Sequence, residues 1–196
     1  MTTLAFALAA TIKHDGHGGI ADLLSTPEQA TAWLTDHNHL VIAVLGPETG
    51  AGGWRGELVR RELVEVRRAV RALFARAVAP WAPSKADADR LMDLSEALEA
   101  VNHAARLLGS SELVWEDEPR VRWGLRTEDP VDLLVGAVGR SAVDFMAGPD
   151  RHRLRACPAA RCVKYFLQDD PRQTWCSPAC GNRERVNRHY RKRTAG

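Results

Sequence analysis

The chain has 196 residues, of which 45% are hydrophobic and 27% are charged, and its formal net charge is +2. A chain of this length can bury one sizeable core and still carry a small additional module. Its longest apolar run, Leu4 to Ala10, is far shorter than the about 20 residues that cross a bilayer. No Lys or Arg precedes that run, so it is not typical of a signal peptide. We therefore expect a cytoplasmic protein without a membrane segment, in which Leu4 to Ala10 packs into the core.

The first helix start is indicated at Thr26. This residue can act as the N-cap, because Pro27 suits the first helical position and Gln29 follows three residues after the cap. We expect a short helix that ends near Thr35 and buries one apolar face. That face consists of Ala30, Trp33 and Leu34.

Two longer amphipathic helices are predicted next. From about Trp54 to Ala79, apolar residues recur at intervals of three and four. The stripe of this helix is Val59, Leu63, Val66, Val70, Leu73, Phe74 and Ala77. Pro80 to Pro83 interrupts it, and Ser84-x-x-Asp87 resembles a capping box that opens a second helix, which Gly109 ends. The stripe of the second helix is Leu91, Leu94, Leu98, Val101, Ala105 and Leu108. The two stripes are similar in length and joined by a short link, so we expect the helices to pack antiparallel.

A β-hairpin and a third helix complete the N-terminal part of the chain. Glu112 to Trp115 and Val121 to Leu125 flank a polar turn and predict the two strands. The third helix is expected from about Pro130 to Met146, and Gly148-Pro149 stops it. Its buried face is Leu133, Leu134, Ala137, Val138, Ala142 and Phe145. We place the domain boundary at this dipeptide, which divides the chain into residues 1–149 and 150–196.

All four cysteines of the chain lie in the second part, with the spacing Cys157-x4-Cys162-x13-Cys176-x3-Cys180. Two close thiolate pairs on a short connection can surround one tetrahedral ion with Zn–S bonds of about 2.3 Å. We therefore predict one structural Zn²⁺ bound by these four residues. Two small disulfides or four unrelated buried thiols are the alternatives, and both need a coincidence of position that a metal site does not. The metal would fold the module, since structural zinc supplies about 10–16 kcal/mol.

The residues around the cysteines predict a treble-clef-like finger. Val163 to Leu167 and Gln173 to Trp175 are expected to form a hairpin between the two cysteine pairs. The Ser and Pro after Cys176 suit a helix N-terminus, which places Cys176 at the entrance of a helix and Cys180 one turn inside it. The predicted fold class is mainly α with a minor β part. It consists of a helical domain with one β-hairpin, followed by the small four-cysteine finger.

Charge is distributed asymmetrically along the chain. Residues 151–196 contain twelve Lys and Arg against three acidic residues, whereas the first 150 residues contain fifteen against twenty-two. A Zn²⁺ ion with four thiolates adds only −2, so the C-terminal module stays positive. This charge favours binding to the phosphates of nucleic acid. A basic tail that docks on the acidic domain, or that keeps the protein soluble, is the alternative.

Double-stranded DNA is the expected partner of the helix after Cys180. At about 100° per residue, one face of that helix lies on the side of Cys180 and the other points away. The first face carries Arg183, Val186, Asn187 and Tyr190, and the second carries Arg185, Arg188, His189 and Lys192. The candidate DNA contacts are Arg185, Arg188, Lys192, Arg191, Arg193, Arg161 and Lys164, with Arg183 at the rim or bonded to backbone carbonyls.

The sequence WCSPACGNR from Trp175 to Arg183, preceded by the Cys157-x4-Cys162 pair, is similar to the CGNR zinc finger, which is named for the four residues at 180–183. In that family the finger follows a domain called ABATE. Three segments here resemble that domain, namely Leu4 to Leu8, Trp33-Leu34 and Arg60 to Arg68. The resemblance implies a bacterial, DNA-binding regulator of transcription under stress. Its helical domain would sense a small-molecule effector or mediate assembly.

The chain departs from the family pattern at two places. Family members usually carry an Asp and an Asn-Thr soon after the first apolar segment, as though forming a small polar site, where this chain reads Ala9 to Asp15. Gly commonly follows the first cysteine pair, and here Val163 does. The second change leaves metal binding intact. The first removes the basis for carrying over a ligand pocket from the family.

Other functional classes stay open. The pairs His14/His17 and His37/His39 could build a second metal or acid–base site in an enzyme. No nucleophile or third ligand accompanies them, so we expect no enzyme. The finger could instead bind a protein or RNA, and zinc-bound thiolates could act as a redox sensor. A homodimer would double the phosphate contacts.

Overall fold

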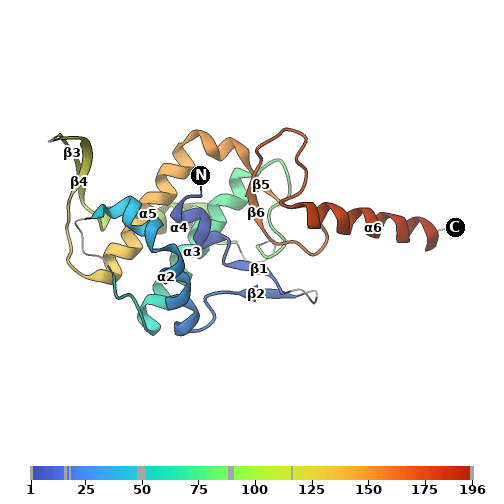
Figure 1. The fold of residues 1–196 in the computed structure, drawn as a ribbon, viewed down its shortest axis with the longest axis horizontal. Coiled ribbons are helices and arrows are strands. Elements are labelled where there is room, and N and C mark those ends of the chain that lie inside the picture. The colour runs from blue at the N-terminus through green and yellow to red at the C-terminus, as the bar shows by residue number, and fades with distance from the viewer. Residues whose placement is uncertain are drawn as a thin grey trace.

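The computed structural model describes residues 2–15, 17, 19–47, 52–87, 91–115 and 117–194, without the side chains of residues 191, 192 and 194. Of the described residues, 54% are helical and 13% are in strands. This confirms the predicted mainly α fold class, in which a helical body precedes a small four-cysteine module. Figure 1 shows the body as a bundle of helices, from which one hairpin and the C-terminal helix project at opposite ends.

Within the described part of the chain, five α-helices form the body. They are α1 (Leu4–Ala9), α2 (Pro27–Leu45), α3 (Glu57–Ala77), α4 (Leu94–Arg106) and α5 (Pro130–Ala147). Helix α5 contacts each of the other four and lies at the centre of the core. Gly136 and Gly139 allow α4 to approach it closely, because a Cβ on Gly139 would lie only 2.4 Å from the backbone N of Ala105. The predicted face of α5 is buried as expected.

Helix α2 is longer than its sequence predicts. Thr26 caps it through a 3.3 Å hydrogen bond from the N–H of Gln29, as expected. The helix passes Thr35, whose hydroxyl donates to the carbonyl of Thr31 one turn earlier, and ends at Gly46, whose φ is 85°. The added turns bury Val41 and Leu45 against the core, so tertiary packing continues the helix where its local signals are weak.

The start and the buried face of α4 also differ from the prediction. Ser84 and Asp87 do not cap this helix, which begins after Asp93. The predicted core residues Leu94 and Leu98 are exposed. The residues of α4 that are buried are Ala97, Val101 and Ala104. Small side chains on this face allow the close helix packing that a row of leucines would prevent.

The described residues also form three two-stranded antiparallel hairpins. They pair β1 (Ile12–His14) with β2 (Ile20–Asp22), β3 (Ser110–Trp115) with β4 (Pro119–Gly124), and β5 (Leu154–Ala156) with β6 (Tyr165–Leu167). The first hairpin was not predicted, because strands of three residues carry too little alternation to be recognised. The second forms where it is expected.

The β3–β4 hairpin projects from the body, as Figure 1 shows. Leu113 and Trp115 on this hairpin are 72% and 71% exposed. Near its base, Trp123 packs against the core and its indole N–H donates to the carbonyl of Val44 over 2.8 Å. The hairpin is therefore attached to the body at one end only.

The C-terminal module begins with a short 3-10 helix, η2 (Pro149–Arg153), and ends with α6 (Pro178–Thr194). Its hairpin differs from the predicted one. Strand β6 pairs with β5, which precedes the first cysteine, and 173–175 is not a strand. Among the described residues, no helix is both long and apolar enough to cross a membrane.

Candidate metal centre and nucleic-acid interface

The structure brings the four cysteines together, with all four sulfur atoms within 4.8 Å of one another. The Sγ atom of Cys176 lies 3.6 Å from that of Cys162 and 3.6 Å from that of Cys180. All four cysteines are free, and these two distances are far longer than the S–S bond of a disulfide, which is about 2.0 Å. They fit a tetrahedral site, because Zn–S bonds of about 2.3 Å place the sulfur atoms about 3.8 Å apart. The donor set and its geometry are thus those of one structural zinc.

Hydrogen bonding among the thiols links metal binding to protons. Hydrogen bonds from Cys162 and Cys176 lower the pKa of the Cys157 thiol. The hydrogen bond to Cys157 in turn raises the pKa of the Cys176 thiol. Binding of a cation by four thiolates must displace the protons that remain, so acid weakens the metal site.

The β5–β6 hairpin delivers the first cysteine pair. Its tight connection is closed by the N–H of Cys157, which donates to the carbonyl of Lys164 over 2.9 Å. Within this connection, the N–H of Cys162 donates to the carbonyl of Ala159 over 2.9 Å. We call residues 157–164 the zinc knuckle. The β5–β6 pairing therefore positions the two thiolates of the zinc knuckle.

Helix α6 delivers the second pair. Cys176 precedes the helix, and the N–H of Cys180 in its first turn donates to the hydroxyl of Ser177 over 3.4 Å. Gly181 is required by packing, because a Cβ there would lie 2.9 Å from the Trp175 ring. Glu184 fixes the helix to the zinc knuckle by accepting a 2.8 Å hydrogen bond from the N–H of Ala160.

The rest of α6 projects beyond the module into solvent (Figure 1). Its predicted inner face does not pack on a core, since Val186 and Tyr190 are 53% and 61% exposed. The reason is that the module ends at the metal. The buried cluster around the cysteines contains Cys180, in the first turn of α6, but neither of these two later residues.

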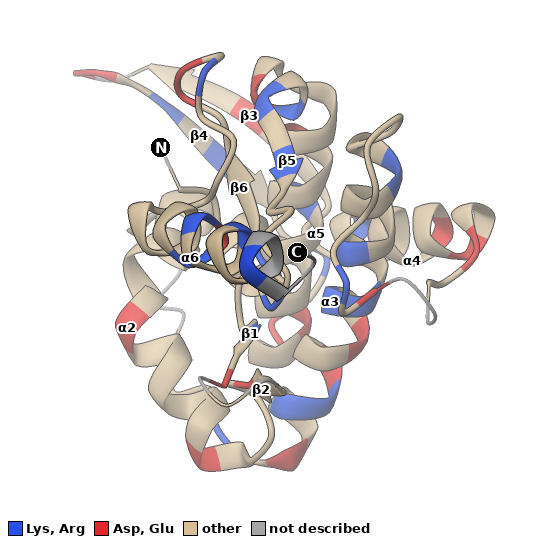
Figure 2. Cartoon of the chain, turned by 90° about the vertical axis from the view of Figure 1, so that its right-hand side faces the viewer, with Lys and Arg blue, Asp and Glu red and all other residues tan. Residues whose placement is uncertain are grey.

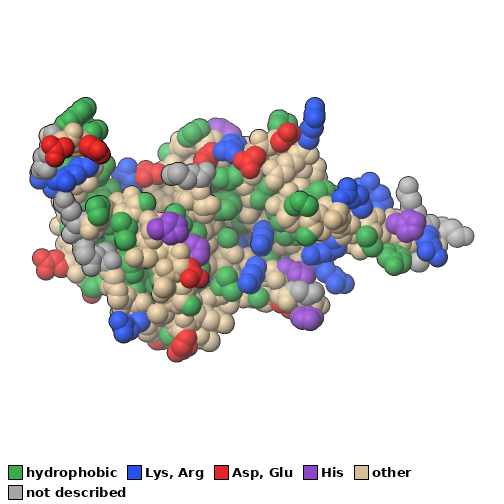
Figure 3. Space-filling model, viewed as in Figure 1, with side chains coloured by type: hydrophobic (Ala, Val, Ile, Leu, Met, Phe, Trp, Pro, Cys, Tyr) green, Lys and Arg blue, Asp and Glu red, His purple; other side chains and the backbone are tan. Residues whose placement is uncertain are grey.

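The predicted DNA contacts fall into three groups. Arg185, Arg188 and Arg193 are exposed on α6, and Arg161 and Lys164 are exposed on the zinc knuckle. Arg183 is half-buried, whereas the side chains of Arg191 and Lys192 lie outside the described residues. Figure 2 views α6 end-on and shows Lys and Arg at several positions around it, and Figure 3 shows basic side chains along its length. We call these exposed residues of the helix and of the zinc knuckle the basic surface.

A notch of about 300 Å³ lies beside the first turns of α6. Trp175, Gly181, Arg185 and Arg188 line it together with Pro178 and Glu184. It is open to solvent on the basic surface. An aromatic ring beside two guanidinium groups offers both stacking and charge to a phosphate or base at this place.

A buried polar network joins the zinc knuckle to the helical body, and the sequence did not reveal it. Arg71 of α3 makes a bidentate ion pair with Asp87, at 2.8 and 2.9 Å. The hydroxyl of Tyr165 donates to the same carboxylate over 2.7 Å.

Two side chains of the body also bond directly to carbonyls of the zinc knuckle. Ser84 donates to the carbonyl of Val163 over 2.8 Å, and Lys85 donates to the carbonyl of Ala159 over 2.9 Å. Residues predicted to cap a helix therefore hold the metal module.

Burial has a clear electrostatic effect in this network. Burial, together with the nearby Asp87 carboxylate, raises the pKa of Tyr165 well above its usual range. The phenol therefore stays protonated and remains a hydrogen-bond donor. The Arg71 guanidinium lies 5.2 Å from the Tyr165 ring centre, which adds a cation–π contact between the body and the module. Arg67 and Arg71 are four residues apart and lie next to the apolar stripe of α3, on the same side of the helix. This spacing is the signal in the sequence that could have identified them as buried arginines.

Among the residues that the structure describes, neither histidine pair is grouped with a further metal-binding side chain. His14 lies in β1 and His17 in the following turn, where its N–H donates to the Asp15 carboxylate over 2.7 Å. The His37 ring stacks on Trp33 in α2, 6.5 Å from the ring of His39. Within the described ranges, the four cysteines are the group of His, Cys, Asp or Glu found close enough to share an ion.

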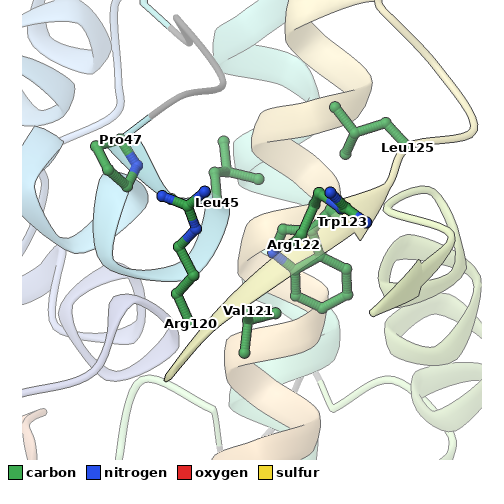
Figure 4. A pocket seen from close by; sticks show the side chains of 8 residues that line it. Leu45, Pro47, Arg120, Val121, Arg122, Trp123 and Leu125 are labelled. Carbon is green, nitrogen blue, oxygen red and sulfur yellow. The ribbon is translucent and has the colours of Figure 1, made fainter. Parts of the chain in front are cut away.

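Another cavity, of about 330 Å³, lies at the base of the β3–β4 hairpin. Figure 4 shows Arg120 extending from β4 toward Pro47 and Leu45 at the end of α2. Trp123 lines the cavity, and the guanidinium of Arg140 lies 5.6 Å from its ring centre. This cavity is remote from the metal centre, since the hairpin and α6 lie at opposite ends of the molecule (Figure 1).

Comparison with known families divides the chain into two parts. The family model described as "ABATE: Putative stress-induced transcription regulator" matches residues 2–149. The model described as "CGNR zinc finger" matches residues 153–193, which include all four cysteines. No curated protein matches the chain.

Proposed function

The chain belongs to the ABATE family and carries a CGNR zinc finger, and on this premise we propose that it is a cytoplasmic transcription regulator that binds double-stranded DNA. The zinc finger would contact the DNA, and the helical domain would sense a small-molecule effector or mediate assembly, including formation of a homodimer. The proposal is of a binding protein and assigns no catalytic step.

The observation that supports DNA binding best is the basic helix that projects from a metal centre. Helix α6 contains a single acidic residue, Glu184, and that carboxylate accepts a hydrogen bond from the zinc knuckle. Arg185, Arg188 and Arg193 are exposed on the same helix. An exposed helix with unneutralised arginines suits the major groove or the phosphates beside it.

The zinc knuckle extends this surface. Arg161 and Lys164 are exposed on a segment that the metal and Glu184 fix to the start of α6. Contacts to phosphates from a rigid segment would set the orientation of the helix on the duplex without reading its sequence. We assign Arg185 and Arg188 the leading role, because they also line the notch beside Trp175.

The test compares two double variants that lose the same charge. Binding of the zinc-loaded chain to a random-sequence duplex is measured by fluorescence anisotropy at about 50 and about 200 mM salt. In Arg185→Ala/Arg188→Ala we expect weaker binding, with a slope of log affinity against log salt that is smaller by about 2. The control is Arg120→Ala/Arg122→Ala on the β3–β4 hairpin, at the opposite end of the molecule.

Equal affinities and equal slopes for the two double variants would remove α6 from the proposed interface. A wild-type chain that fails to bind the duplex at low salt while retaining its zinc would reject DNA binding altogether. The metal content of each variant is measured in parallel, so that a lost finger is not mistaken for a lost contact.

A protein or RNA partner is the second candidate. Val186 and Tyr190 are exposed on α6 beside its arginines, and apolar groups on a helix favour a protein groove over a DNA backbone. Replacing both with Ser separates the candidates. Unchanged duplex affinity in this variant supports DNA binding by the arginines, whereas loss of a protein partner with DNA binding intact supports an adaptor.

A further inference from the structure

A cavity of about 530 Å³ lies between the helical body and the C-terminal module. The body contributes Trp81, Pro83 and Lys85, which follow α3, and the module contributes Arg155 of β5 and Phe166 of β6. Figure 1 shows the segment after α3 beside these two strands. The volume is within the range of small-molecule sites. An occupant of this cavity would therefore contact both parts of the chain.

The charge that lines this cavity is not balanced. Its charged lining residues are Lys85 and Arg155, and neither makes an ion pair within the described part of the chain. Asp169 and Asp170, in the adjoining turn, do not line the cavity, and Asp169 pairs with Arg153 instead. Two positive charges without a carboxylate beside them attract an anion, and they suit one with two negative charges.

Arg155 presents donors that the described residues leave unused. Its Nη1 atom donates to the carbonyls of His152 and Leu154, over 2.8 and 2.7 Å. Its Nε and Nη2 atoms donate to no acceptor in the described part of the chain. Stacking holds the guanidinium in place, 4.4 Å from the ring centre of Trp81. Such a fixed pair of adjacent N–H groups can bind two oxygens of a phosphate or carboxylate.

Lys85 adds a further donor at the contact with the zinc knuckle. Its Nζ atom donates to the carbonyl of Ala159 over 2.9 Å and to that of Cys157 over 3.4 Å. An ammonium group carries three N–H donors, so one of them remains for an occupant. An anion bound by Lys85 would therefore lie at the point where the body holds the metal module.

Much of the remaining lining is apolar. Trp81 is 57% exposed, and Pro83, Pro158 and Pro171 add rigid apolar surface beside it. An inorganic ion would leave this surface in contact with water, whereas an aromatic ring would cover it. Aromatic rings also stack on an indole or on the plane of a guanidinium group. The lining therefore combines an anion-binding side with a surface for a flat ring.

We propose that this cavity binds a small planar aromatic compound with two negative charges, held by Arg155 and Lys85 beside Trp81. The proposal deepens the effector-sensing part of the proposed function and rests on it, by assigning the effector a site and a chemical class. Binding of the small molecule is measured without DNA, so its failure is distinct from a failure of DNA binding.

Binding is tested with the zinc-loaded full chain by calorimetric titration with phenyl phosphate. At about pH 7.5 a phosphate ester is largely doubly charged. Inorganic phosphate supplies the charge without the ring, and benzylamine supplies a ring with the opposite charge. We expect saturable binding of phenyl phosphate, an affinity for inorganic phosphate that is lower by about tenfold or more, and no binding of benzylamine.

The lining is tested with single variants. In Arg155→Gln and in Lys85→Gln the affinity for phenyl phosphate should fall about tenfold or more, and in Trp81→Ala about threefold or more. The matched control is Arg151→Gln, because Arg151 is an exposed arginine of the same module that does not line the cavity. Its affinity should equal that of the wild type. Zinc content and urea unfolding of each variant show that a lost contact is not a lost fold.

The proposed site is rejected if phenyl phosphate does not bind, if Arg155→Gln and Lys85→Gln bind it as the wild type does, or if Arg151→Gln weakens binding as much as they do. Inorganic phosphate that binds as tightly as phenyl phosphate would reject the aromatic class. Duplex DNA is another source of phosphate groups and bases. A duplex that displaces phenyl phosphate from the wild type and binds more weakly to Trp81→Ala would assign the cavity to DNA and overturn the small-molecule proposal.

Discussion

Helices α3 and α6 are both long and rich in arginine, yet they use it in opposite ways. On α3, Arg67 and Arg71 are buried and paired with Asp22 and Asp87. The more accessible Arg60, Arg61 and Arg68 pair with glutamates of the same helix. On α6 the single carboxylate, Glu184, bonds to the zinc knuckle instead. The number of arginines on a helix therefore does not predict a binding surface, because their partners decide whether they hold the fold or remain exposed.

The two helices also differ in what holds them. Helix α3 packs in a large apolar core, where Leu63, Val70 and Phe74 are fully buried. Helix α6 is anchored at its first turns by the cysteine cluster and by Trp175, and the rest of it has no core to contact. The metal thus stabilises α6, whereas apolar packing stabilises α3.

Removing the metal should destabilise the protein most. It should also give the largest difference between α6, which we expect to lose its structure, and α3, which we expect to keep it. In Cys176→Ser we expect loss of zinc, which contributes about 10–16 kcal/mol in structural sites. Hydrogen exchange should become fast in α6 and stay slow in α3. A variant that retains one zinc per chain and a protected α6 would contradict a metal-anchored helix.

Breaking the buried ion pair should give the next largest effect. Arg71→Gln leaves Asp87 buried without its cation, which we expect to lower the free energy of unfolding by about 3–5 kcal/mol. The control Arg61→Gln, on the exposed side of the same helix, should change it by about 0.5 kcal/mol or less. Both are measured by urea unfolding. Equal effects would show that the burial of Arg71 has no energetic consequence.

Tyr165→Phe tests the contact between the body and the module, and it should lower the stability less than Arg71→Gln does. It removes the hydroxyl that donates to Asp87 and keeps the ring that packs on Phe74. We expect a loss of about 1.5–3 kcal/mol in the free energy of unfolding, as for a hydrogen bond to a charged group. Stability equal to the wild type would mean that the hydroxyl adds nothing beyond the ring.

Acid should affect the α3 network through Asp22. Burial acts to raise the pKa of this carboxyl, but the hydrogen bonds from Arg67 and from the N–H of Leu24 outweigh it and lower the pKa. Its stabilising contribution is therefore complete above the unfolded-state value of 3.8 and is lost as the pH falls through the lower folded-state value. The difference in stability between the wild type and Asp22→Asn should shrink over this range, and a constant difference would contradict the assignment.

Removing arginine from α6 should have the smallest effect on stability. Arg185→Ala/Arg188→Ala removes two exposed side chains, and we expect the free energy of unfolding to change by about 0.5 kcal/mol or less. Urea unfolding of the zinc-loaded protein measures this change. A loss comparable with that of Arg71→Gln would show that α6 uses arginine for the fold, as α3 does.

The sequence predicted those features whose signals are local. The cysteine spacing identified the metal site, and the Thr26 cap, the α3 stripe and the buried face of α5 were read correctly from caps and periodicity. A cap depends on a few adjacent residues, and a stripe depends only on helix geometry. Such features do not require knowledge of what packs against them.

The sequence by itself thus determined the helical class, the four-thiolate centre and the charge asymmetry of the chain. The tertiary structure alone decided that Ser84 and Asp87 hold the metal module, that β5 is the partner of β6, and that Val186 and Tyr190 have no core to contact. The physical reason is that hydrogen-bond partners and burial depend on residues distant in the chain. From the sequence alone, Asp87 is interpreted as part of a helix cap. Only the fold shows that it pairs with Arg71 and Tyr165 instead.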